Sequence, residues 1–330
     1  MEKDLENIEK IHNNQNLLEK IYYIMKKIRL VEERIALEYP NNEIRCPTHL
    51  SIGQEAVPSA LSILLKEKDF AVSTHRGHAH YLSKGGSLRK MIAEIYGKAK
   101  GCSGGKGGSM HLIDKNVGFM GTSAIVGNSI PIGVGLGLSI KLKKEPLLSC
   151  IYLGDGAIEE GSFYESLNFS VLKNLPVLFI CENNLYSVYS PLSKRQPKGR
   201  TIHSLAKSIG ANSCQCDGNN VFKAIVLLNK IIDEIRYGNN KTWFVEFDTY
   251  RWREHCGYQF DNNLGYRSQE EFEEWKSKDP LNFVEPKLKK IIDIKKIDKL
   301  INNEIEDAFA DAKSAPFPDS EDAFSSVFAE

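Results

Sequence analysis

Apolar residues recur at helical spacing through the first forty positions of the chain. They lie three, four or seven residues apart at Leu17, Leu18, Ile21, Ile24, Met25, Ile28, Val31 and Ile35. This spacing places them on one face of a helix, so the pattern predicts an amphipathic helix over residues 1–38. Pro40 and Pro47 interrupt the pattern and predict its end.

Three later segments are short, continuously apolar and partly β-branched or aromatic, at residues 147–153, 177–181 and 243–247. Runs of this kind are typical of parallel strands that are buried on both faces. Helical patterns over residues 163–172 and 221–237 separate them. Alternation of strand and helix predicts an α/β fold with an open, mostly parallel sheet flanked by helices.

The remaining segments complete this outline. A helix is predicted over residues 53–65 and a short strand over 70–73. The charged segment from Ser268 is predicted to be helical and to end in a proline-containing extension. We therefore divide the sequence into an N-terminal helical arm (1–45), an α/β domain (46–267) and a C-terminal helical extension and tail (268–330).

Two segments are rich in glycine. Residues 101–109 (GCSGGKGGS) contain too much glycine for a helix or strand and are predicted to form a loop. Residues 130–141 carry Gly133, Gly135 and Gly137 within an apolar run. Neither segment fits a phosphate-binding glycine motif. We interpret the second as a buried helix whose glycines permit close packing against its neighbours.

Composition places the chain among ordinary globular enzymes, with 42% hydrophobic and 26% charged residues. Forty-three basic and forty-three acidic residues cancel, so no global charge favours binding to nucleic acid or to a membrane surface. The seven cysteines are odd in number and scattered, which argues against a disulfide framework. No signal sequence or membrane span is evident, and we expect a cytoplasmic location.

Polar residues follow two of the predicted strands. Gly154-Asp155-Gly156 comes directly after the first, and Asn183-Asn184 follows the second after one residue, Glu182. The interval fits one helix and one returning strand, so Asp155 and Asn184 should lie at neighbouring strand ends, where α/β sheets bind ligands. A carboxylate and an amide oxygen are ligands that Mg²⁺ prefers, with phosphate oxygens completing its shell. Taken alone, however, each motif also fits a simple tight turn.

The same residues resemble a known family. GDG followed at this interval by NN is similar to the thiamine diphosphate motif of transketolase-like enzymes. HLSIGQEAV (49–57), STHRGHAHYLSKG (73–85), GKGGSMH (105–111) and ENNLYSVYS (182–190) resemble the alpha subunit of 2-oxo acid dehydrogenases. The likeness is greater to the pyruvate and acetoin dehydrogenase branch than to the branched-chain branch. It extends from about residue 20 to the C-terminus.

The resemblance implies a thiamine diphosphate-binding fold and a set of site residues. Asp155 and Asn184 would ligate Mg²⁺ through their side chains, and Tyr186 through its carbonyl. His111 and His255 would be the catalytic histidines, acting by proton transfer or charge stabilisation. Contacts to the cofactor are implied for His75, Arg76, Ala124, Ile125, Val126, Gly154, Asp155, Gly156, Ala157, Asn184, Tyr186 and His255. We interpret His78 and His80 as structural residues or as residues that support the site without contacting the cofactor.

Several departures from the family pattern bear on function. Ala124 stands where the family usually has glycine, and His75 where it often has tyrosine. In the segment 252–256, Arg253 and Glu254 replace the first two residues of the family's H-G-H. Cys256 replaces a serine that is phosphorylated in some animal members, so that regulatory site is absent. The altered segment borders the active-site entrance in the family.

The family also implies a partner. Thiamine diphosphate catalysis needs a glutamate beside the aminopyrimidine ring, which in two-subunit enzymes comes from a beta chain. We therefore expect a tetramer of two alpha and two beta chains that decarboxylates a 2-oxo acid or cleaves acetoin and transfers the acyl group to a lipoyl acyltransferase. Two alternatives stay open: a thiamine-dependent acyl or aldehyde transferase of a biosynthetic pathway without a lipoyl partner, and a non-catalytic phosphate-binding protein.

Overall fold

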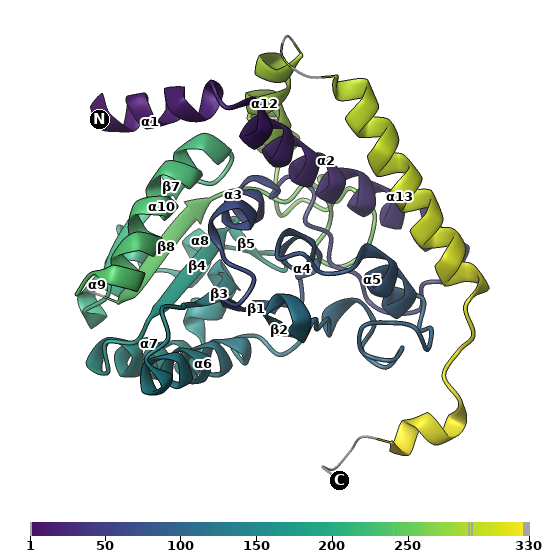
Figure 1. Ribbon diagram of the computed structural model, residues 1–330, viewed down its shortest axis with the longest axis horizontal. Helices are drawn as coiled ribbons and strands as arrows, with labels where there is room; N and C mark the ends of the chain where they lie inside the picture. Colours follow the sequence, from purple (N-terminus) through teal and green to yellow (C-terminus); the bar gives the residue numbers. More distant parts are fainter. Residues whose placement is uncertain (1, 240, 290, 292, 326–330) are drawn as a thin grey trace.

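Six strands form the central sheet, in the order β2-β1-β3-β4-β8-β7, and every neighbouring pair is parallel (Figure 1). The computed structural model describes residues 2–239, 241–289, 291 and 293–325. The strands are β1 (Phe70–Thr74), β2 (Phe119–Ser123), β3 (Ser149–Gly154), β4 (Val177–Asn183), β7 (Asn212–Asp217) and β8 (Thr242–Asp248). The sheet confirms the predicted α/β fold, including the three buried strands.

The continuous apolar runs of the central strands are explained by burial on both faces of the sheet. Along β3, Ile151 belongs to the core on one face, while Tyr152 belongs to the core on the other. Phe179 and Ile180 alternate in the same way along β4. Both faces of a parallel strand are covered, so no polar position interrupts the run.

Helices cover the two faces unequally (Figure 1). One face carries α6 (Ser129–Lys143), α7 (Gly161–Leu172) and α9 (Ile202–Ile209). The other carries α3 (Ala56–Leu64) and α10 (Val221–Tyr237), with α4 (His78–Ser83) and α5 (Leu88–Ile95) beside them. Helix α2 (Gln15–Glu38) packs on α3 and α4.

The prediction of one helix over residues 1–38 is wrong in one respect. The segment forms two helices, α1 (Glu2–His12) and α2, separated at Asn13 and Asn14. The Asn14 side chain accepts a hydrogen bond from the Leu17 amide and so caps α2. An asparagine that bonds its own backbone in this way favours a helix start over a helix interior.

Three other expectations need correction. Helix α3 begins at Ala56 rather than at Gly53, whose φ of +98° is incompatible with a helix. Helix α6 is buried on one face only, with Ile132 and Leu142 exposed. Strands β2 and β7 were not predicted, because their sequences FMGTS and NSCQCD are partly polar and only partly buried.

Short elements connect the main ones. They are η1 (Tyr39–Asn41), η2 (Gly108–Met110), η3 (Lys115–Val117), η4 (Asp155–Glu159), the antiparallel pair β5 (Tyr186–Ser187) and β6 (Ser190–Pro191), and α8 (Leu192–Arg195). Residues 39–47 interrupt the helical pattern as predicted, and residues 101–107 are loop.

The C-terminal segment is helical, as predicted, with α11 (Gln269–Ser277), α12 (Pro280–Leu288), α13 (Ile294–Ser314) and η5 (Ser320–Phe324). Helix α13 packs on α2 and α5, so helices from the N-terminal and C-terminal parts of the chain lie against each other, while α1 and η5 lie at opposite sides of the molecule (Figure 1). Arg29 of α2 also pairs with Glu55 and with Asp279, next to α12. The domain boundaries at 45 and 267 stay a prediction.

Candidate active site

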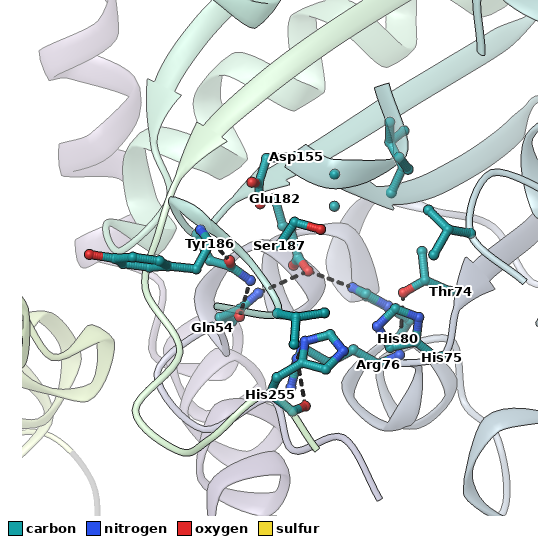
Figure 2. Close-up of a pocket in the computed structure, with 17 residues that line it drawn as sticks. Gln54, Thr74, His75, Arg76, His80, Asp155, Glu182, Tyr186, Ser187 and His255 are labelled. Atoms are coloured by element: carbon teal, nitrogen blue, oxygen red, sulfur yellow. Dashed lines mark hydrogen bonds and ion pairs between the residues drawn. The ribbon is translucent and has the colours of Figure 1, made fainter. Parts of the chain in front are cut away.

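A pocket opens at the carboxyl ends of β1, β3 and β4, where the strand pattern predicted the chemistry to lie (Figure 2). Ten of the predicted site residues line it: His75, Arg76, Val126, Gly154, Asp155, Gly156, Ala157, Asn184, Tyr186 and His255. They come from five separate stretches of the chain. The parallel sheet is what brings these stretches together.

Asp155 and Asn184 each follow directly after one of two adjacent strands, as the sequence predicted. Strands β3 and β4 pair in register, with Gly154 opposite Glu182. Asp155 is 1% exposed and Asn184 7% exposed. The Asn184 Oδ1 accepts a hydrogen bond of 3.3 Å from the Tyr186 amide, which keeps this oxygen beside the Tyr186 backbone. The three proposed metal ligands therefore occupy one end of the pocket.

Asp155 is paired with a guanidinium group. Arg195, at the end of α8, donates one hydrogen bond to the Asp155 carboxylate and another of 2.7 Å to Glu159. Burial raises the pKa of Asp155, and the neighbouring Arg195 opposes this rise. A buried carboxylate needs a cation. The Asp155 carboxylate is thus built to hold a positive charge, and Mg²⁺ fits that requirement.

Gly156 permits a close approach of two loops in this part of the pocket. A Cβ atom at Gly156 would lie 2.5 Å from the Ser187 hydroxyl oxygen. No heavy atom would lie within 4 Å of a Cβ at Gly154, which leaves its backbone open. Backbone that is free of side chains can approach a diphosphate closely.

Arg76 joins the loops on the opposite side of the pocket. Its guanidinium donates hydrogen bonds of 2.6 Å to the Leu50 carbonyl and 3.0 Å to the His255 carbonyl. Burial, and then the charge of Arg251, lower its pKa to about 10. Arg76 therefore stays charged at neutral pH and provides the positive charge that a phosphate group needs.

Three imidazoles cluster beside Arg76. The ring centroid of His49 lies 4.5 Å from that of His75 and 5.0 Å from that of His255. His75 and His255 are labelled in Figure 2. Burial and the charge of Arg76 lower the pKa of His75 to about 4 and that of His255 to about 2. The same two causes lower the pKa of His49 far below its usual range.

All three rings are therefore neutral at pH 7. A neutral imidazole has one nitrogen that donates a hydrogen bond and one that accepts one, so each ring can bond a ligand without adding charge to the resting site. One nitrogen from each ring lies within 4.8 Å of the others, which is a spacing that could hold a metal ion. The nearby Arg76 charge opposes a cation there and disfavours a metal ion among the three rings.

Three predicted residues do not line the pocket. His111 is exposed, with its Nδ1 3.0 Å from the Gly107 carbonyl. Ala124 is half-buried, and Ile125 is 69% exposed and projects from the surface. The structure does not bring these side chains to the residues around Asp155. Each lies in a loop whose position no local pattern fixes.

The altered segment 252–256 is a braced loop. Arg253 donates a hydrogen bond of 2.9 Å to the Tyr258 carbonyl, and Glu254 accepts one of 2.9 Å from the Gln259 amide. Beneath it, the buried Asp261 pairs with both Arg251 and Arg267. The residues that differ from the family pattern therefore hold the loop that carries His255.

Apart from His80, interpreted as a structural or supporting residue, several residues of the site have no role assigned from the sequence. The pocket is also lined by Gln54, Thr74, His80, Leu153, Glu182, Ser187 and Val188, and His49 lies in the histidine cluster. Gln54, His80 and Glu182 stand within the family-like stretches quoted above. Their position in those stretches was the available signal, but only the folded chain shows which groups they contact.

No helix in the described part of the chain is long and apolar enough to cross a membrane. The sequence pattern of the family "Dehydrogenase E1 component" matches residues 23–321. A pyruvate dehydrogenase E1 component subunit alpha of Rickettsia bellii is 33% identical over 313 residues, covering 92% of this chain and 93% of its own. That of Rhizobium meliloti is 33% identical over 314 residues, covering 93% and 89%.

A chloroplastic subunit alpha-3 of Arabidopsis thaliana is also 33% identical, over 313 residues, covering 92% of this chain and 72% of its own. The match of the family pattern extends over most of the sheet, the pocket and the C-terminal helices. The chain therefore belongs to the dehydrogenase E1 component family, as an alpha subunit of the 2-oxo acid dehydrogenase type.

Proposed function

We propose that this chain binds thiamine diphosphate through Mg²⁺ and acts on a pyruvate-like 2-oxo acid together with a beta subunit. The observation that carries this proposal is the position of Asp155 and Asn184, buried at adjacent strand ends and facing the same pocket as Arg76. A pocket with a cation-binding end and a phosphate-binding arginine suits a magnesium diphosphate.

The chain's own residues would hold this group as follows. Asp155 and Asn184 would ligate the ion by side-chain oxygens, and Tyr186 by its carbonyl. Arg76 would bind phosphate oxygens, and Gly154 and Gly156 would leave room for them. When bound, the cofactor supplies the carbanion chemistry by which a 2-oxo acid is decarboxylated. His255, neutral in the resting site, would donate or accept a proton at the reacting carbon.

A beta subunit is supported by the surface around α6. Ile125, Ile132 and Leu142 are 69%, 50% and 73% exposed, and Leu172 of the neighbouring α7 is 72% exposed. Ile132 and Leu142 lie on α6, Ile125 in the loop before it, and α6 packs on α7. Several exposed apolar side chains on neighbouring elements favour a contact surface. A tetramer of two alpha and two beta chains would cover them. We also propose that the beta chain supplies the glutamate that the family places beside the aminopyrimidine ring.

The acyl acceptor separates two versions of this function. A lipoyl acyltransferase is the acceptor that the family resemblance implies, with pyruvate or acetoin as substrate. The loop 252–256 favours the alternative, a thiamine-dependent transferase of a biosynthetic pathway, because Arg253 and Glu254 change the residues beside His255. A non-catalytic phosphate-binding role is the least favoured, because the sequence keeps the residues proposed for metal binding and proton transfer, of which Asp155, Asn184 and His255 line the pocket. We propose the cytoplasm as the compartment.

Reconstitution tests the proposal. The full chain is combined with a beta chain encoded beside it, thiamine diphosphate and Mg²⁺, and release of CO₂ from pyruvate is measured with a dye as acceptor. The proposal requires turnover by the combination and little or none by either chain alone. A lipoyl domain, added as acceptor in place of the dye, separates the two versions. Full turnover by the alpha chain alone would contradict the two-subunit proposal.

A further inference from the structure

The Asn184 side chain has two ends, and only one of them can bind a metal ion. Its oxygen is a ligand for Mg²⁺, whereas its NH₂ group is a donor and cannot ligate a cation. A half-turn of the amide would exchange them. The proposed metal site therefore depends on what fixes the orientation of this amide.

Gln54 bonds the NH₂ end of Asn184. The Asn184 Nδ2 donates a hydrogen bond of 3.2 Å to the Gln54 Oε1, and both side chains are buried. This contact leaves the Asn184 oxygen on the side of the Tyr186 amide. Gln54 is itself an amide, however, so its direction needs a further cause.

Glu182 supplies that cause. The Gln54 Nε2 donates a hydrogen bond of 3.2 Å to the Glu182 Oε2 (Figure 2). An ionised carboxylate only accepts hydrogen bonds, so Gln54 must turn its NH₂ toward Glu182 and its oxygen toward Asn184. The order of donors and acceptors along these three side chains is thereby fixed.

His80 holds Glu182 in place from the other side. The His80 Nε2 lies 3.2 Å from the same Glu182 oxygen, and its Nδ1 lies 2.7 Å from the Ser73 hydroxyl on β1. The imidazole stacks on Tyr152 at a centroid distance of 3.9 Å. Packing and the Ser73 hydroxyl therefore fix the ring. Its Nε2 makes no hydrogen bond to Glu182, so the ring restricts the position of the carboxylate by close approach alone.

We propose that Gln54, directed by Glu182, is a positioning residue that turns the oxygen of Asn184 toward the metal. This inference rests on the proposed function, because it concerns how tightly the same site holds its ion. Outer residues of this kind typically change metal affinity tenfold to a hundredfold. The series of side-chain contacts from Ser73 through His80, Glu182 and Gln54 to Asn184 would then favour one of the two orientations of the Asn184 amide.

The test is a double-mutant cycle on the full chain assembled with its beta subunit. Gln54→Met keeps the length of the side chain and removes both hydrogen bonds. We expect it to raise the Mg²⁺ concentration needed for thiamine diphosphate binding, measured by calorimetry, about tenfold. In an Asn184→Asp background both carboxylate oxygens can ligate, so the same Gln54→Met change should alter that concentration less than twofold.

Two further variants separate positioning from general loss of structure. Gln215→Met removes a glutamine of β7 that is exposed and lies outside the pocket, and whose Nε2 donates a hydrogen bond of 2.9 Å to Asp248 of β8; it should leave magnesium dependence unchanged. Glu182→Gln keeps the shape but removes the acceptor-only group, and should weaken magnesium binding in the same direction as Gln54→Met. The calorimetric affinities are compared with thermal unfolding of the same samples.

An equal effect of Gln54→Met in the wild-type and Asn184→Asp backgrounds would overturn the inference, since amide orientation would then not matter. Wild-type magnesium dependence in both Gln54→Met and Glu182→Gln would overturn it as well. Failure of the proposed function has a different signature, because the wild-type assembly would then bind no magnesium and thiamine diphosphate at all.

Discussion

Replacing Arg195 tests whether its guanidinium neutralises Asp155 when no metal ion is bound. The Arg195 side chain is 9% exposed and its partner Asp155 is 1% exposed, so the pair is buried. In Arg195→Gln the carboxylate loses its cation. Removing one partner of a buried ion pair costs about 3 kcal/mol or more. Divided by the unfolding entropy of a 330-residue chain, this corresponds to a melting temperature lower by about 4 °C without ligands.

The loss should disappear when Mg²⁺ and thiamine diphosphate are bound. In the proposed holo state the ion, and not Arg195, neutralises Asp155, so the substitution costs little there. The same free energy then appears as tighter binding, and we expect magnesium-dependent binding to improve at least tenfold. Calorimetry gives the affinity and calorimetric melting gives the stability, each with and without ligands.

Lys194→Gln is the matched control, because it removes the same charge from the next residue, which is exposed. It should change neither quantity. If Arg195→Gln instead weakens binding, or lowers the melting temperature equally in both states, Arg195 does not exchange with the metal. It would then either stay on Asp155 or bind the cofactor itself.

Three other predictions follow from the same geometry. Asp155→Ala should abolish magnesium-dependent cofactor binding in calorimetry, and wild-type affinity would refute the metal assignment. Gly133→Ala should destabilise the chain by about 1–3 kcal/mol in urea unfolding, because its Cβ would lie 2.4 Å from a side-chain atom of β3. Gly135→Ala has open space around the new Cβ and should not destabilise the chain. If this substitution weakens binding to the beta subunit, Gly135 lies at the interface. Burial and the charge of Arg76 lower the pKa of His75 from 6.5 to about 4. Between pH 6.5 and 4 the unfolded chain therefore binds more protons at this residue than the folded chain does. The free energy of unfolding should fall as the pH drops through this range. His75→Tyr should flatten that decline in urea midpoints, and an unchanged slope would contradict it.

The core of the fold could be predicted because its strands are buried on both faces. Continuous apolar runs identify β3, β4 and β8 without reference to any partner strand. The edge strands β2 and β7 could not be predicted in this way, because their residues are partly polar and partly exposed. These residues form a strand only because they pair with the neighbouring strand. Intrinsic strand propensity is weak at such positions, and pairing with the neighbouring strand determines the structure.

The residues of the site also fall into those that the sequence pattern could place and those that it could not. Asp155 and Asn184 could be placed together because strand order and the length of one connection bring them there. His111 could not be placed, because a glycine-rich loop has no periodicity to orient it. Gln54 and Glu182 contact each other across 128 residues of sequence. Their hydrogen bond depends on tertiary packing alone.

The charges of the pocket limit what it can bind. At one end, the Asp155 carboxylate requires a cation, and Arg195 provides one in its absence. At the other, Arg76 is charged beside three neutral imidazoles, and its hydrogen bonds go to neutral groups, the Leu50 carbonyl and the carbonyl and ring of His255. A lone metal ion would satisfy the first end and leave the second unneutralised, and a lone anion would do the reverse. A ligand that carries a divalent cation and a diphosphate together satisfies both, which is the physical reason to expect the ion and the cofactor to bind as one unit.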